Sequence, residues 1–326
     1  MVQTVEPTAF REACRARNRA AAYYLFNPRV TLIDVGWRIK ETQREQIDRE
    51  LAVRVHVHHK PRGPAFEAFA ERHRNLIVDK AKIPFPVDIV SGTYPLQWYG
   101  YPAPSHPRGR VFSSLCGGIS ISNEWAFNYG TLGGLVQDRD TGNEMVLSNW
   151  HVLAGSAYIH RGLRIYQPGC ADGGCLQHTI AYLERHAMNE GIDAAVARLT
   201  GDRQWINDQL DVGPVSGVAA PALGLRVVKS GRGSGVTDGL IDGVEGEYPI
   251  RYGGLWRRIK HVYRIVPLNA TGQVSRGGDS GSWWLEKDTQ RAVALHFAGF
   301  DRPETALAIA MPPVLEALNV DICAGN

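Results

Sequence analysis

Apolar and polar residues alternate along two stretches near the N-terminus. Residues 30–40 and 50–60 show the period of two that is typical of a half-buried β-strand, and we expect them to pair as a hairpin. Residues 64–81 carry apolar side chains at the spacing of an amphipathic helix, and another strand is expected over residues 86–90. The pattern predicts a small β-β-α-β unit, with a helical arm rich in Ala and Arg before Asn27.

Prolines then interrupt the pattern. Residues 94–114 contain four prolines, so neither a helix nor a strand ladder can run through them unbroken. We expect an N-terminal helical arm and small α/β domain over residues 1–100, a proline-rich linker over residues 101–115 and a second domain over residues 116–326. In the second domain, short apolar alternations separated by turn residues are typical of an antiparallel barrel or sandwich, and a last helix is expected over residues 311–320.

The composition is that of an ordinary globular protein. The net charge of +3 comes from 36 basic and 33 acidic residues without a block of one sign, which argues against a nucleic-acid partner. We expect a cytoplasmic protein that does not enter a membrane, because no stretch approaches the about 18 apolar residues of a membrane span and no apolar signal core stands at the N-terminus. The five cysteines are few and odd in number, so even Cys170 and Cys175, the closest pair, are expected to be reduced.

Three short motifs supply the groups that acyl transfer needs. A serine hydroxyl is a poor nucleophile, so it needs a base, an anion to orient the base and donors for the oxyanion. His151 ends an apolar run in SNWHVLAG, Asp193 stands just before the alternating strand in GIDAAVARL, and Ser280 lies in the glycine-rich turn of GGDSGS. Each is a commonplace residue alone, but their joint presence predicts a hydrolase.

These motifs resemble the His, Asp and Ser motifs of chymotrypsin-like serine peptidases of the trypsin superfamily, in that family's order. The resemblance implies a mainly β fold, a double six-stranded β-barrel preceded by the small α/β domain. It implies that Ser280 is the nucleophile, His151 the general base and Asp193 the orienting anion, with the amides of Gly278 and Ser280 as the oxyanion hole. Asp279 takes the place where zymogens of this family recruit a new N-terminus, yet no activation sequence precedes the barrel, so we expect activation without cleavage.

A narrower resemblance covers the whole chain. The segments VTLIDVGWRIK, IYQPGCADGG, GRGSGVTDG and MPPVLEALNV are similar to bacterial trypsin-like peptidases related to the plant NARROW LEAF 1 protein, which also carry a small α/β unit ahead of the protease. The family register places the specificity pocket at five residues: Val274, Ser275, His296, Phe297 and Gly299. Val274 stands where trypsin-type enzymes carry an acid, which disfavours cleavage after Arg or Lys, whereas His296 with Ser275 favours an acidic residue before the scissile bond.

Other motifs have simpler interpretations. The glycines of GRGSGVTDG lack the βαβ context and spacing of a dinucleotide loop, so a turn between strands is expected. The spacing of Cys170, Cys175, His178 and His186 matches no standard zinc site, and we expect neither a metal nor a cofactor. His56 and His58 share one strand face, which we interpret as a solvated face rather than a ligand pair.

The sequence therefore predicts a serine endopeptidase that hydrolyses protein or peptide substrates through an acyl-enzyme. Regulation by the N-terminal domain, a protein partner or a homo-oligomer is expected. Two other functions stay open: a pseudoprotease that binds a partner without turnover, and an esterase that uses the same three residues.

Overall fold

The structure is a computed structural model of the 326-residue chain. It describes residues 5–25, 27–38, 50–58, 68, 85–95, 106–126, 128–156, 159–252, 255–269, 272–301 and 304–323. The helix predicted over residues 64–81 and much of the predicted linker lie outside these residues. Strands dominate the described chain, as the alternating pattern predicted.

The first barrel is built on an eight-stranded sheet. Its strands lie in the order β21 (Val320–Ile322), β7 (Gly134–Asp138), β8 (Glu144–Ser148), β11 (Asp193–Leu199), β10 (Thr179–Met188), β9 (Arg164–Tyr166), β5 (Ser120–Asn123) and β6 (Gly130–Thr131). The sheet has eight strands rather than the predicted six, partly because the C-terminal strand β21 returns to pair with β7. A separate three-stranded sheet contains β13 (Gly213–Pro214), β12 (Gln204–Gln209) and β4 (Ser114–Gly117).

The second barrel closes on itself with six strands, as predicted. Its ring consists of β15 (Arg226–Gly231), β18 (Trp283–Glu286), β19 (Arg291–Asp301), β20 (Glu304–Ala310), β17 (Leu255–Pro267) and β16 (Gly235–Tyr252), and β15 pairs with β16 to complete it. The short β14 (Gly217–Val218) pairs with β19. The predicted last helix is α4 (Met311–Ala317), which carries proline in its first turn where a missing backbone N–H does no harm.

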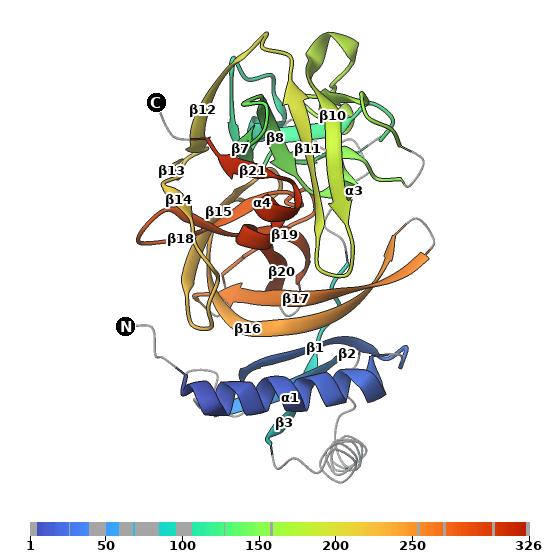
Figure 1. Ribbon diagram of the computed structural model, residues 1–326, viewed down its shortest axis with the longest axis vertical. Coiled ribbons are helices and arrows are strands. Elements are labelled where there is room, and N and C mark those ends of the chain that lie inside the picture. Colours follow the sequence, from blue (N-terminus) through green and yellow to red (C-terminus); the bar gives the residue numbers. More distant parts are fainter. Residues whose placement is uncertain are drawn as a thin grey trace.

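The N-terminal strands extend the sheet of the second barrel. The predicted hairpin is present as β1 (Val30–Trp37) and β2 (Leu51–Val57), and β3 (Val87–Ser91) runs parallel to β2. The hairpin strand nearer the barrel, β1, pairs with β16, so one sheet continues from the barrel into the N-terminal unit. The predicted helical arm is α1 (Pro7–Tyr24), which lies along β1 and β2 below the long β16–β17 ribbon (Figure 1).

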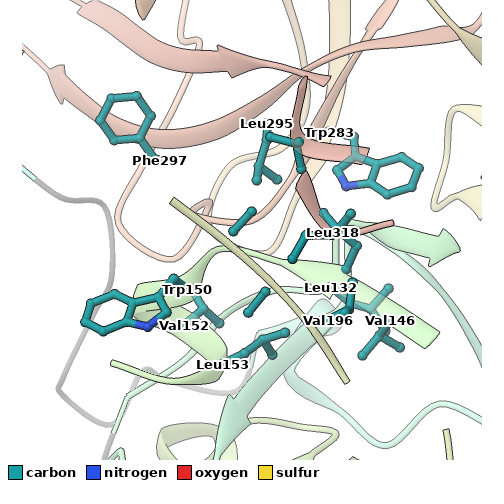
Figure 2. Packing of buried hydrophobic residues seen from close by; sticks show 14 of the residues in the cluster. Leu132, Val146, Trp150, Val152, Leu153, Val196, Trp283, Leu295, Phe297 and Leu318 are labelled. Atoms are coloured by element: carbon teal, nitrogen blue, oxygen red, sulfur yellow. The ribbon is translucent and has the colours of Figure 1, made fainter. Parts of the chain in front are cut away.

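One hydrophobic core joins the two barrels. Figure 2 shows side chains of the first barrel, among them Leu132, Val146 and Val196, beside Trp283 and Leu295 of the second. All five are fully buried. Burial of apolar surface stabilises a protein by about 25 cal/mol per Å². This shared interior therefore holds the two barrels against each other. Loops that lie between them are therefore held on a rigid frame.

Candidate active site

The imidazole of His151 is delivered by the end of a core strand. β8 ends at Ser148, and α3 (Trp150–Leu153) begins two residues later. Trp150, Val152 and Leu153 of this short helix are buried in the shared core (Figure 2), so the turn that carries His151 cannot move freely. His151 itself is buried, with only 5% of its surface exposed.

The carboxylate of Asp193 contacts His151 at two points, the imidazole and the backbone N–H. Asp193 is the first residue of β11 and is fully buried. Its Oδ2 lies 2.6 Å from His151 Nδ1, its Oδ1 accepts the His151 backbone N–H at 3.2 Å, and its own carbonyl accepts from Asn149 Nδ2 at 2.9 Å. Because a carboxylate only accepts hydrogen bonds, Nδ1 carries the proton and Nε2 is left as the acceptor. This is the tautomer that a general base requires.

Ser280 lies in a tight turn that leads into β18. It is fully buried, its carbonyl accepts the Thr131 N–H at 2.8 Å, and its Oγ donates to the Phe297 carbonyl at 3.1 Å. A hydroxyl has one proton, so donation to His151 requires Ser280 Oγ to leave Phe297. Thr131 links the two segments, because Ser148, three residues before His151, donates to the carbonyl of the same Thr131 at 2.8 Å.

Glycine is required on both sides of the serine. Gly278 has φ +98° and Gly281 has φ +97°, which L-residues with a side chain adopt only with strain. Gly278 is the third residue of a turn in which the Asp279 N–H donates to the Arg276 carbonyl at 3.1 Å, the position where a type II turn needs positive φ. The Gly278 carbonyl accepts from Thr131 Oγ1 at 2.7 Å. The assignment of the Gly278 and Ser280 amides to an oxyanion hole stays a prediction.

Asp279 is anchored from within the chain by a cation that sequence reasoning missed. Lys229 of β15 is fully buried and its Nζ lies 2.8 Å from Asp279 Oδ2. The same carboxylate accepts from the backbone N–H groups of Gly233, Ser234 and Arg276 at 2.8, 3.0 and 2.9 Å. Burial alone would raise the pKa of Asp279, but the charge of Lys229, followed by that of His296 and the side-chain hydrogen bonds from Lys229 and Ser234, outweighs it and lowers that pKa. The residue beside Ser280 is thus ionised and fixed.

The predicted pocket residues surround the same turn. Val274 and Ser275 are fully buried, and their N–H groups donate to Glu304 Oε1 at 2.9 and 3.0 Å. Glu304 lies at the start of β20, where its sequence context gave no sign of a role. Ser275 Oγ donates to the Thr305 carbonyl at 3.2 Å.

The other three pocket residues lie along β19. His296 and Phe297 are fully buried, and Gly299 donates its N–H to the carbonyl of Pro95 at 3.2 Å. Burial, and then the cation of Lys229, lower the pKa of His296 to about 3. His296 is therefore a neutral imidazole near pH 7, able to donate a hydrogen bond but not a positive charge.

One interpretation of the N-terminal unit was wrong. His56 does not lie on a solvated face: it is fully buried, with Nε2 3.1 Å from Asp34 Oδ1 and Nδ1 2.7 Å from the Tyr94 hydroxyl. The error arose because alternation assigns His56 and His58 to one face without showing that Tyr94 covers only the first. His58 is exposed and bonds to Thr93.

The remaining motifs have structural roles. The glycines 231, 233 and 235 form the turn of the β15–β16 hairpin, as predicted. Cys170 and Cys175 are free thiols. Within the described ranges, no three His, Cys, Asp or Glu side chains gather in a way that could hold a metal ion. No helix among the described residues is long and apolar enough to cross a membrane.

Comparison with known proteins finds similar structures only. No protein-family model matches the chain, and no curated protein matches it. A Nocardiopsis protease is 17% identical, covering 65% of this chain and all of that one at a TM-score of 0.48. Thermobifida fusca protease A is 18% identical over 65% of this chain and all of its own, at 0.47. A glutamic-acid-specific serine protease described as using a histidine triad in substrate binding is 18% identical over 64% of this chain and all of its own, at 0.48. These three structures are proteases, one of them described as a serine protease. The strand pairings of this chain confirm the predicted mainly β double-barrel fold.

Proposed function

We propose that this protein is a serine endopeptidase that hydrolyses peptide bonds of protein substrates through Ser280, His151 and Asp193. The observation that carries the proposal is the two-point grip of the buried Asp193 carboxylate on His151. This grip fixes His151 in the tautomer whose Nε2 can accept a proton, and the turn that carries Ser280 has two positive-φ glycines. The combination serves acyl transfer.

The chemistry follows from the tautomer. His151 Nε2 takes the proton of Ser280 Oγ as the oxygen attacks the scissile carbonyl, and Asp193 stabilises the imidazolium that forms. The amides of Gly278 and Ser280 receive the oxyanion, and His151 returns its proton to the leaving amine. Water then repeats the cycle on the acyl-enzyme and frees Ser280.

The turn is held ready without cleavage of the chain. Lys229 supplies, from β15, the cation that the carboxylate beside Ser280 needs. Because Lys229 already pairs with Asp279, no new N-terminus is needed to supply this cation. This supports the expectation of activation without proteolysis. Control of the enzyme then has to act on substrate access rather than on this turn, through the N-terminal unit, a partner or a second copy of the chain.

Specificity for an acidic residue before the scissile bond stays part of the proposal. The neutral His296, and the hydroxyl of Ser275 once it leaves the Thr305 carbonyl, would act as hydrogen-bond donors to the substrate carboxyl group. The Glu304 carboxylate, bonded to the amides of Val274 and Ser275, opposes this preference by charge. The test is a scan of peptides that differ only in the residue before the scissile bond. Preference for a basic or a large apolar residue there would exclude specificity for acidic residues. The relation to the NARROW LEAF 1 group and a cytoplasmic, bacterial setting are likewise proposals.

The test of the proposal compares the unaltered protein with Ser280→Ala and with Ser216→Ala, which removes an exposed hydroxyl that donates to the Thr289 carbonyl. A serine-reactive phosphonate should label the unaltered protein and Ser216→Ala but not Ser280→Ala. Peptide hydrolysis should fall in Ser280→Ala to the residual about 10³ to 10⁴ over water that binding and the oxyanion hole provide. No labelling of any of them would favour a binding scaffold, and hydrolysis of esters but of no peptide would favour an esterase.

A further inference from the structure

Past its pairing with β18, the backbone edge of β19 continues through Phe297 and Gly299 beside Ser280. Within a strand the N–H and C=O of one residue point the same way, and alternate residues share an edge. The Phe297 carbonyl accepts from Ser280 Oγ at 3.1 Å on the side of β19 where the His296 carbonyl accepts from the Gly281 N–H, because the register shifts between His296 and Ala298. Two residues on, we place the Gly299 N–H on the same edge, opposite the edge that pairs with β20. A peptide on this edge would have its backbone beside the nucleophile.

Extended peptides bind to such an edge as an added strand. Main-chain hydrogen bonds supply the affinity in this mode of recognition, and side-chain pockets supply the specificity. If Ser280 is the nucleophile, which this inference takes from the proposed function, residues on the N-terminal side of the scissile bond have to pair with Phe297 and Gly299. The Gly299 N–H is then the donor that a long substrate needs and a single-residue substrate does not.

That donor already has a partner from the N-terminal unit. The Gly299 N–H donates to the Pro95 carbonyl at 3.2 Å, between residues more than 200 positions apart in the sequence. Pro95 ends the segment Gly92–Pro95, which follows β3 directly. The segment therefore occupies the edge that a substrate strand would use.

Every residue of the segment makes a hydrogen bond to the rest of the protein. The Gly92 N–H donates to the Val57 carbonyl at 2.9 Å, and the Gly92 carbonyl accepts from Thr31 Oγ1 at 2.6 Å. Thr93 Oγ1 lies 3.0 Å from His58 Nδ1. The hydroxyl of Tyr94 lies 2.7 Å from His56 Nδ1, and Tyr248 of β16 donates to the Tyr94 carbonyl.

A buried charge network fixes the Tyr94 end of this segment. His56 Nε2 lies 3.1 Å from Asp34 Oδ1, so Nε2 carries the proton and Nδ1 accepts from Tyr94. Arg54 grips Asp34 with Nε at 2.8 Å and reaches Asp242 of β16 with Nη1 at 3.1 Å. Asp34, Arg54 and His56 are fully buried, so these positions are set by the fold of β1, β2 and β16.

We propose that the segment Gly92–Pro95 is an autoinhibitory strand, which blocks the substrate edge of β19 and closes the site to extended peptides until the N-terminal unit releases it. Ser280 and His151 stay assembled beneath it, because neither belongs to the segment. The segment competes with substrate backbone for the Gly299 N–H. Its removal from that edge should raise peptide hydrolysis without altering the chemistry at Ser280.

The test loosens the segment and compares two substrates with the same residue before the scissile bond, a single-residue activated ester and a tetrapeptide amide. Thr31→Val with Tyr94→Phe removes two hydroxyl contacts to the segment, and Tyr248→Phe removes a third independently. A net hydrogen bond shifts an equilibrium about fivefold, so the double variant should raise kcat/KM for the tetrapeptide about tenfold or more. The ester should change less than about twofold. Tyr182→Phe, at an exposed tyrosine of β10, is the matched control.

Amide exchange at Gly299 reports the segment directly. The N–H should be protected in the unaltered protein and exchange faster in the double variant and in Tyr248→Phe. Fast exchange in the unaltered protein would overturn the proposal, as would faster exchange in the variants with no gain in tetrapeptide hydrolysis. Absence of ester hydrolysis in every protein would instead refute the protease function on which the proposal rests.

Discussion

At the scale of single residues, Lys229 decides whether the turn around Ser280 keeps its shape. Lys229→Met removes the cation and leaves the buried Asp279 carboxylate with hydrogen bonds only. Breaking a buried pair from one side costs about 3 to 5 kcal/mol. We expect the free energy of unfolding measured in urea to fall by this amount. We also expect kcat/KM to fall about 10²-fold or more, because the proposed oxyanion donors Gly278 and Ser280 lose their fixed positions. Lys287→Met, at a half-exposed lysine paired with Asp238, should change neither, and equal effects of the two variants would refute this role.

Two buried histidines set the pH dependence of stability. Burial lowers the pKa of His296 to about 3 and also lowers that of His56, so both stay neutral in the folded protein. In the unfolded chain a histidine binds a proton near pH 6.5, so below that pH the unfolded state holds more protons and stability falls with falling pH. The lowered pKa of Asp279 adds a loss in the same direction at more acid pH. The urea midpoint should therefore drop steadily from pH 7 to pH 5, and His296→Asn should flatten part of that slope. A midpoint that does not change with pH would contradict the assignment.

The sequence predicts the groups whose chemistry lies in a local motif. His151, Asp193 and Ser280 each stand at a strand end that the apolar pattern marks, so their types and settings could be inferred. Lys229 could not be predicted, because its approach to Asp279 depends on the pairing of β15 with β18, more than 50 residues apart. The hydrogen bonds of Glu304 to Val274 and Ser275, and the burial of His56, depend in the same way on contacts between distant segments.

At the scale of elements, the turn before β18 should be intolerant of side chains. A Cβ on Gly281 would lie 2.0 Å from Ser148 Oγ, and φ is +97°. Gly281→Ala should destabilise the protein by about 2 to 4 kcal/mol and abolish most activity, because strain of about 1 to 3 kcal/mol adds to a clash within the core. Gly201→Ala is the matched control, since φ there is +86° but nothing lies within 4 Å. It should show the backbone strain alone, and an equal loss in both variants would mean that the clash is relieved.

The hydrophobic pattern predicts strands better than it predicts their partners. The strands over residues 30–40 and 50–60 were predicted from alternation. The expectation that they are half-buried was wrong, because both faces of β1 and β2 are buried in the structure. Alternation contains no signal for the pairing of β1 with β16, because the two strands meet only in the folded chain. The prediction of a separate small unit therefore omitted the sheet that continues into the second barrel.

At the scale of the whole molecule, this continuous sheet predicts cooperative unfolding of the N-terminal unit and the second barrel. Arg54 crosses the boundary, bonding to Asp34 of β1 and Asp242 of β16, and the latter also pairs with Arg264 of β17. Asp34→Asn leaves Arg54 short of a buried carboxylate and should cost about 3 to 5 kcal/mol. Trp283 and Trp284 are buried inside the barrels, so their fluorescence reports barrel unfolding. Because the sheet is shared, Asp34→Asn should lower the unfolding midpoint measured by this fluorescence and by far-ultraviolet circular dichroism to the same value. The exposed Asp288→Asn should leave that midpoint unchanged. Two separate transitions, with the tryptophan signal unaffected by Asp34→Asn, would show that the N-terminal unit folds independently of the second barrel.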